Sequence, residues 1–341
     1  MKPIVDLTKK EKKKNMKCVK SIFCTAVVMM AAEMFAAPYV TNVVAKQRSP
    51  WGIVDISCEV AGIEEETNGL SFIVEAVLPD SGVKKVSNVR FRGYGNQAGL
   101  SVTTNGNYQF VWNANYDLGT ARYTNMLMRV SIIKLPASVQ LWEDGPYWAT
   151  TNIGAEKPEE YGCYFWWGDT VGYKRENDKW VASDGSNANF SFSESNTPTY
   201  GKSISALQSE EWITSGGVLA PEHDAATVHW GNGWRMPTEG EMSALVKNCD
   251  WTWTTQNGVR GYIFKGRGTY TASSIFLPAA GYGYGASLRN VGSDGGYWSS
   301  VPGPSFSCDA WFLDFCSSRN PNSNGLRFYG RTVRPLKWFT K

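Results

Sequence analysis

Tryptophan is distributed unevenly along this chain, and this asymmetry constrains the fold more than any other feature. Thirteen of the fifteen tryptophans of the 341-residue sequence lie at or beyond Trp142. Because this half has few aliphatic side chains, large aromatic rings are needed to build its core. We therefore expect Trp148, Trp166, Trp234 and Trp298 to pack inside a C-terminal domain. The length leaves room for about two domains.

The first half has a different pattern. From residue 40 to residue 135, apolar and polar side chains largely alternate with the period of half-buried strands. Strands are predicted over residues 54–60, 70–78, 86–91, 108–112 and 126–133. Short strands separated by turn residues predict an immunoglobulin-like or fibronectin-like β-sandwich over residues 38–137, ending in a hinge at Pro136.

Positive charge is concentrated at the N-terminus. Residues 1–37 contain eight lysines and three acidic residues, so 26 of the 34 basic and 28 of the 31 acidic residues follow them. The body of the chain therefore has a net charge of about −2. This balance gives no reason to expect a nucleic-acid partner.

Residues 17–37 have the organisation of a secretory signal, with a basic extension before it. Lys17 and Lys20 precede a short apolar run, and Ala36 and Ala37 provide a cleavage site. The run is too short to span a bilayer, so we expect no transmembrane span in the mature chain. Whether translation starts at Met1 or at a later methionine, residue 16, stays open. A buried helix or an uncleaved anchor is the alternative; we expect export to the periplasm, the cell surface or the medium.

Five cysteines follow the predicted signal, and their odd number leaves at least one thiol outside any disulfide. They are Cys58, Cys163, Cys249, Cys308 and Cys316. If residues 309–315 form one strand, the Cα atoms of Cys308 and Cys316 are separated by roughly 26 Å. A disulfide needs roughly 4.4–6.8 Å. We therefore expect structural thiols, and a Cys163–Cys249 disulfide stays open.

One helix is clearly predicted in the second half, over residues 239–247. Thr238 is its expected N-cap, and Glu241 occupies the capping-box position three residues later. The inward face is expected to consist of Met242, Leu245 and Val246. The remainder is predicted as short strands and long loops, which gives an α+β fold class overall.

Several motifs of the second half occur together in an ordered series. They are residues 147–155, 158–162 and 165–169, then 224–226, 230–231 and 234–238, and finally 277–282, 296–300, 310–315 and 332–335. Through these motifs, residues 139–336 resemble the Fibrobacter succinogenes major paralogous domain. The resemblance implies a C-type-lectin-like domain over residues 138–341, with the fold of formylglycine-generating enzymes and retroelement-diversified binding proteins.

Residues that often carry chemistry have simpler explanations here. The two histidines, His223 and His229, lack further ligands at zinc spacing, so we predict no metal and no cofactor. Residues 281–285, Gly-Tyr-Gly-Tyr-Gly, lack the Lys-Ser/Thr of a phosphate-binding loop and are interpreted as a glycine-rich surface loop. The calcium triplets Glu-Pro-Asn and Gln-Pro-Asp do not occur, which leaves lectin-like calcium binding unsupported. Formylglycine-generating enzymes carry a closely spaced cysteine pair, from which the spacing of Cys308 and Cys316 departs, so no catalytic residue is predicted.

The C-terminal segment carries the predicted function. In retroelement-diversified relatives the corresponding segment is the variable ligand surface, and the polar, asparagine-rich residues 317–325 resemble it. We expect noncatalytic binding of a glycan or protein ligand. The candidate ligand-binding residues are Trp311, Arg319, Asn320, Asn322, Asn324, Arg327 and Tyr329. A solvated loop is the alternative at this segment. For the whole chain, a structural or scaffold module of the cell envelope is the second hypothesis and an oxidase the third.

Overall fold

A computed structural model of the chain is rich in strands, and every pairing between its named strands is antiparallel. It describes residues 38–48, 52–63, 69–79, 82–86, 89–91, 101–102, 104–119, 125–185, 190–231, 233–304, 307–317 and 323–338. The predicted export signal lies outside the described residues. No helix within the described ranges is long and apolar enough to cross a membrane.

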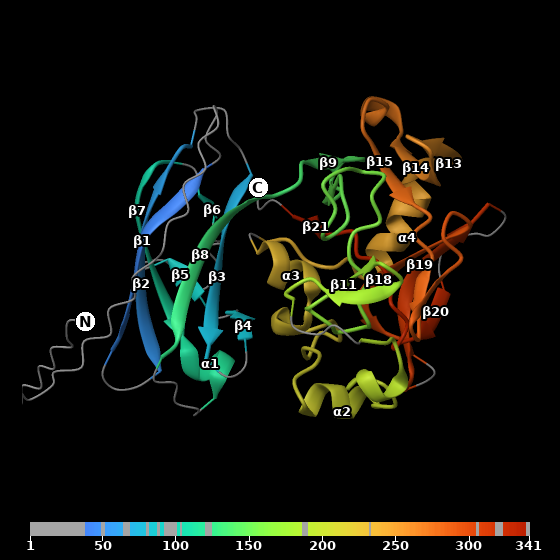
Figure 1. Ribbon diagram of the computed structural model, residues 1–341. Coiled ribbons are helices and arrows are strands. Elements are labelled where there is room, and N and C mark those ends of the chain that lie inside the picture. The colour runs from blue at the N-terminus through green and yellow to red at the C-terminus, as the bar shows by residue number, and fades with distance from the viewer. Residues whose placement is uncertain are drawn as a thin grey trace, which may run out of the picture.

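Residues 39–134 form two antiparallel sheets (Figure 1). The first has the order β1 (Tyr39–Gln47), β2 (Ile53–Ala61), β7 (Gly106–Asn113), β5 (Val89–Phe91). The second has the order β4 (Gly82–Lys85), β3 (Leu70–Leu78), β6 (Ser101–Val102). In this sheet β8 (Leu127–Lys134) also pairs with β3. A short helix, α1 (Ala114–Leu118), follows β7. The predicted strand at residues 86–91 was wrong in extent, because the chain passes from one sheet to the other between β4 and β5.

One hydrophobic core joins the two sheets. Along β2 alternate side chains are buried, including Val54, Ile56 and Val60, which confirms the period-two pattern. Phe72 of one sheet and Phe110 of the other meet edge to face, with ring centroids 4.9 Å apart. The two sheets therefore pack face to face through aromatic and β-branched side chains.

The connection to the second half lies at residues 135–137, where the sequence predicted a hinge. Leu135 is buried in the same hydrophobic cluster as Ala149 and Trp234. Its amide also donates to the carbonyl oxygen of Gly69 at 2.6 Å. The N-terminal side of the predicted hinge is thus held by both halves of the chain.

The C-terminal region, residues 138–338, consists of several small sheets. Their strands are β9 (Ser138–Gln140), β10 (Tyr147–Ala149) and β21 (Leu336–Lys337); β11 (Tyr173–Glu176) and β12 (Lys179–Ala182); β13 (Cys249–Gln256), β14 (Val259–Gly266) and β15 (Ser274–Pro278); β16 (Tyr282–Tyr284) and β17 (Ser287–Arg289); and β18 (Asp294–Pro302), β19 (Asp309–Cys316) and β20 (Ser323–Leu326). Because β10 pairs with both β9 and β21, the first and last strands of this region lie in one sheet.

The helices of this region are short. They are α2 (Ile204–Ser209), α3 (Ala225–Trp230) and α4 (Glu239–Asn248), with 3₁₀ turns η1 (Glu194–Asn196), η2 (Pro221–His223) and η3 (Gly268–Tyr270). The capping box predicted for α4 is confirmed: the Glu241 amide donates to Oγ1 of Thr238, and the Thr238 amide donates to Glu241. Met242 and Leu245 are buried, as predicted. Arg235 adds a two-bond ion pair to Glu241, which ties the helix start to the preceding motif.

Aromatic rings fill the core of the C-terminal region. Trp148, Trp234 and Trp298 are at most 1% exposed, which confirms their predicted packing role. Trp166 is only partly buried and meets Trp212 edge to face at 6.1 Å. The tryptophans of this region therefore mainly build its core, and Trp166 lies at the edge of that core.

The five cysteines carry thiols in the structure, three of them buried. Cys308 precedes β19 and Cys316 ends it, so the strand separates the two sulfur atoms. The closely spaced pair of a formylglycine-type oxidase is therefore not formed by these residues.

Candidate functional site

Within its described part, the C-terminal region contains a cavity of about 220 Å³ that combines aromatic and charged side chains. It is lined by Gly281, Tyr282, Asn290, Asp294, Gly295, Gly296, Phe312, Asp314, Tyr329 and Arg331. We call this cavity the Arg331 pocket. Its walls come from the hairpin β16–β17 and the residues after it, from β18 and β19, and from the segment that follows β20. Folding alone brings these stretches together.

The hairpin β16–β17 holds one wall in place. A Cβ atom on Gly283 would collide with the ring of Phe192, so glycine allows this face of the hairpin to pack closely. The Gly285 carbonyl oxygen accepts from the Phe192 amide at 3.0 Å and from Nε1 of Trp180 at 3.1 Å. Tyr282, which lines the pocket, therefore stands on a hairpin fixed to an aromatic cluster.

A second glycine positions the opposite wall. Gly330 exchanges two backbone hydrogen bonds with Gly283, of 2.7 and 2.9 Å. The two neighbours of Gly330 in the chain, Tyr329 and Arg331, both line the pocket. The rings of Tyr282 and Tyr329 meet with centroids 5.1 Å apart. The pairing of the two glycines thus brings two tyrosines together beside one arginine.

Arg331 is the most informative group in the pocket. Its side chain is 7% exposed, and its buried Nε has no hydrogen-bond partner. The guanidinium carbon lies 3.4 Å from the centroid of Phe312 and 5.7 Å from those of Tyr282 and Tyr329. Burial lowers the pKa of Arg331 to about 10, so the group stays charged at neutral pH. The guanidinium is thus held by aromatic faces rather than by hydrogen-bond acceptors of the described chain, which leaves hydrogen-bonding capacity for a partner in the pocket.

Two carboxylates accompany this cation. The negative charges of Asp314 and Asp294 counteract the effect of burial on the pKa of Arg331. Asn290 donates from Nδ2 to Oδ2 of Asp294 at 2.7 Å and so orients that carboxylate. The described lining residues thus include one basic and two acidic side chains.

These groups favour a neutral ligand that carries hydroxyl groups. A hydroxyl accepts a hydrogen bond from the guanidinium and donates one to a carboxylate, so it satisfies both kinds of group. An anion would meet the two aspartates, and a cation would meet Arg331. The tyrosine rings offer apolar faces for the C–H groups of a ring-shaped ligand.

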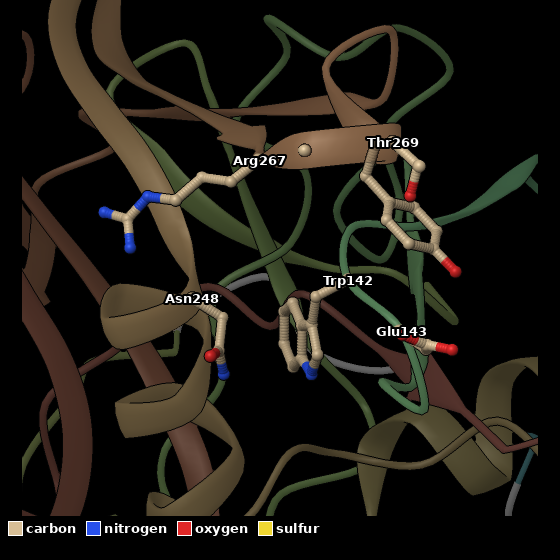
Figure 2. A pocket seen from close by; sticks show the side chains of 7 residues that line it. Trp142, Glu143, Asn248, Arg267 and Thr269 are labelled. Atoms are coloured by element: carbon tan, nitrogen blue, oxygen red, sulfur yellow. The ribbon is translucent and has the colours of Figure 1, made fainter.

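A second cavity, of about 370 Å³, lies elsewhere in the region (Figure 2). In this view the side chain of Trp142, one of the lining residues, lies between those of Asn248 and Glu143. The Arg267 guanidinium in its wall is already engaged, since it donates to Asp250 at 2.7 Å and to two backbone carbonyls at the end of α4. Because its one arginine stabilises the helix end, this cavity has a weaker claim to be a binding site than the Arg331 pocket.

The predicted site residues lie in different parts of the structure. Arg319, Asn320 and Asn322 lie outside the described residues. Tyr329 lines the Arg331 pocket. Trp311 is partly buried in β19 and pairs across the sheet with the exposed Asn324 of β20.

Trp311 lies on the wrong face of its strand for this pocket. Side chains alternate along a strand, so Phe312 and Asp314 point away from the side of Trp311. Both of these residues line the Arg331 pocket, whereas Trp311 does not. The residue predicted from this strand, Trp311, therefore lies outside the pocket, which is lined by Phe312 and Asp314 of the same strand.

The placement of Arg327 at the ligand surface was wrong. Its side chain is fully buried, with Nε donating to the Asp309 carbonyl at 2.9 Å and Nη1 donating to those of Thr199 and Lys202 at 2.8 and 2.9 Å. Arg327 therefore holds backbone segments together. Sequence alone could not show this, because two of its acceptors lie more than a hundred residues away.

Most residues of the Arg331 pocket were not predicted from the sequence. Tyr282 lies in residues 281–285, which were interpreted as a surface loop but contain strand β16. The strict Gly-Tyr alternation was the available signal: period two places the glycines on one face and the tyrosines on the other. Arg331 had no comparable local signal, since its role depends on distant rings.

Comparison of the chain with protein-family models, with curated proteins and with solved structures gave no match. The function is therefore argued from the geometry of the Arg331 pocket.

Proposed function

We propose that this chain is an exported, noncatalytic binding protein and that the Arg331 pocket holds a neutral glycan. The observation that carries the proposal is the Arg331 guanidinium, stacked on Phe312 at 3.4 Å in a pocket that Asp294 and Asp314 also line. Aromatic faces together with donors and acceptors are the chemistry that hydroxylated rings require.

The charged side chains of the Arg331 pocket favour neutral glycans over acidic ones. Two carboxylates and one guanidinium line the same small cavity, so an added carboxylate or sulfate on the sugar would lie close to the carboxylates of Asp294 and Asp314. Neutral hydroxyls can bridge the two kinds of group without this repulsion. We therefore expect neutral sugars to bind more tightly than uronic or sulfated ones.

The proposed architecture places the pocket on a C-type-lectin-like domain of the Fibrobacter paralogous type, over residues 138–341. The ordered motifs of the sequence support this assignment, as does the closure of the region by β9, β10 and β21. The two-sheet region before it is proposed to be an immunoglobulin-like or fibronectin-like spacer. The predicted signal at residues 17–37 supports export.

The test is titration of the purified chain with neutral and acidic glycans, first on an array and then by calorimetry. Arg331→Met keeps the apolar stem but removes the donors, so we expect at least a 10-fold loss of affinity, from about 1.5–3 kcal/mol of charged hydrogen bonding. Trp311→Ala, on the opposite face of β19, is the matched control and should bind as the wild type does.

Two results would contradict the proposal. If no glycan binds, the hypothesis of an envelope scaffold replaces the glycan proposal. If a protein partner is captured instead, the ligand is a protein. If glycans bind but Arg331→Met and Trp311→Ala are equally active, the ligand lies outside the Arg331 pocket.

A further inference from the structure

The surface beside the Arg331 pocket repeats its construction. On the same hairpin, the guanidinium carbon of Arg289 lies 4.2 Å from the ring centroid of Tyr284. Inside the pocket, Arg331 is stacked on Phe312 at 3.4 Å. In both cases a planar cation rests on an aromatic ring, which holds the guanidinium in a fixed orientation.

The second stack is open to solvent. Tyr284 is 39% exposed, which is high for a large ring in a region whose aromatic side chains are mostly buried. Arg289 forms no ion pair and donates no hydrogen bond to any residue that the structure describes. The donors of the exposed Arg289 are therefore available to a ligand.

The two stacks are neighbours. Tyr284 contacts Tyr329, which lines the pocket, with ring centroids 5.7 Å apart. Tyr282 and Tyr284 are two residues apart on β16, which places them on one face about 7 Å from each other. Asn290, also in the pocket wall, directly follows Arg289. A ligand that leaves the pocket toward the hairpin therefore meets the second stack.

The pocket itself is small. At about 220 Å³ it lies below the roughly 300–1,000 Å³ of sites that enclose a drug-sized molecule, so it suits one ring rather than several. We infer that the ligand is a chain of sugar units, with one unit in the Arg331 pocket and the next against Tyr284 and Arg289. This inference rests on the proposed glycan function and adds the chain character of the ligand.

The experiment compares monosaccharides with their oligomers. Calorimetry would use glucose, mannose, galactose and N-acetylglucosamine, and the linear di-, tri- and tetrasaccharides of each. The disaccharide should bind about 2- to 10-fold more tightly than its monosaccharide, which is the affinity expected from one added ring contact. Tyr284→Ala should abolish this gain and lower the disaccharide affinity much more than the monosaccharide affinity.

Two variants make the result specific. Tyr282→Ala should weaken mono- and disaccharide binding alike, because Tyr282 lines the pocket. Tyr39→Ala removes a comparably exposed tyrosine, 50% accessible, from the N-terminal sheet and should change neither. Equal affinity for mono- and disaccharides, or an equal effect of Tyr284→Ala on both, would overturn the chain inference while glycan binding stands. Absence of binding by every sugar would overturn both proposals.

Discussion

Replacement of Arg334 by methionine should destabilise the C-terminal region more than Arg331→Met does. Arg334 is 1% exposed. Its guanidinium donates to Oδ1 of Asn152 at 2.8 Å and to the carbonyls of Ala149, Thr150 and Phe276 at 3.1, 3.0 and 3.0 Å. One side chain thus joins the segment after β10, the strand β15 and the C-terminal segment.

The expected loss of unfolding free energy follows from the buried acceptors that methionine leaves without a donor. Four hydrogen bonds to a charged donor are worth about 1.5–3 kcal/mol each, and relief of the buried charge returns several kcal/mol. Because the acceptors stay buried, the net cost resembles the removal of one partner from a buried pair, about 4 kcal/mol. For a domain of this size that corresponds to a fall in Tm of about 8–16 °C.

The assay is urea unfolding of the full chain followed by tryptophan fluorescence, which reports mainly on the tryptophan-rich C-terminal region. Arg331→Met is the matched control. Its buried Nε makes no hydrogen bond, and the cation–π contact with Phe312 that methionine removes is worth about 2 kcal/mol, so its unfolding free energy should fall by no more than about 2 kcal/mol. A small cost for Arg334→Met, or equal costs for the two variants, would refute this reasoning.

Three further predictions concern the helix start, the pH dependence and the pocket. Thr238→Ala should lower the unfolding free energy by about 1 kcal/mol in the same assay, through loss of the α4 cap, and Thr238→Ser should retain most of it. Burial raises the pKa of Asp169 to about 7 from 3.8, so between these values the folded chain holds a proton that the unfolded chain has lost. The contribution of Asp169 to stability should fall as pH rises from about 4 to 7, and a wild-type pH slope unchanged by Asp169→Asn would contradict this. Gly296→Ala should reduce glycan affinity in calorimetry, because its Cβ would collide with Nη1 of Arg331, whereas Gly292→Asn, at a positive-φ turn with open space, should bind normally.

Local sequence was sufficient to predict an element where the groups that stabilise it lie close together in the chain. The start of α4 could be predicted because Thr238 and Glu241 satisfy each other's backbone amides three residues apart. Period two identified β2, since alternation is a property of one strand, and an apolar run between turn residues identified β3. Prediction failed at residues 86–91, where the chain changes sheets and the two short strands pair with different partners.

The pocket could be predicted only in small part. Tyr329 was selected for its position in the C-terminal segment, and β19 was selected through Trp311. The alternating side chains of that strand gave two possible faces, and nothing in residues 310–315 says which one borders a cavity. That choice depends on Tyr282, Asp294 and Arg331, which reach the strand from other parts of the chain.

Three arginines near the C-terminus separate what the sequence determined from what the tertiary structure decided. The sequence by itself determined that Arg327, Arg331 and Arg334 are cations among apolar and aromatic residues, in a region whose core must be built from large rings. The fold decided their roles. Arg327 donates to the carbonyls of Thr199 and Lys202, Arg334 donates to Asn152 and three carbonyls, and Arg331 packs against the faces of aromatic rings. A guanidinium has the same donors at every position, so its function follows from the acceptors that distant segments bring to it.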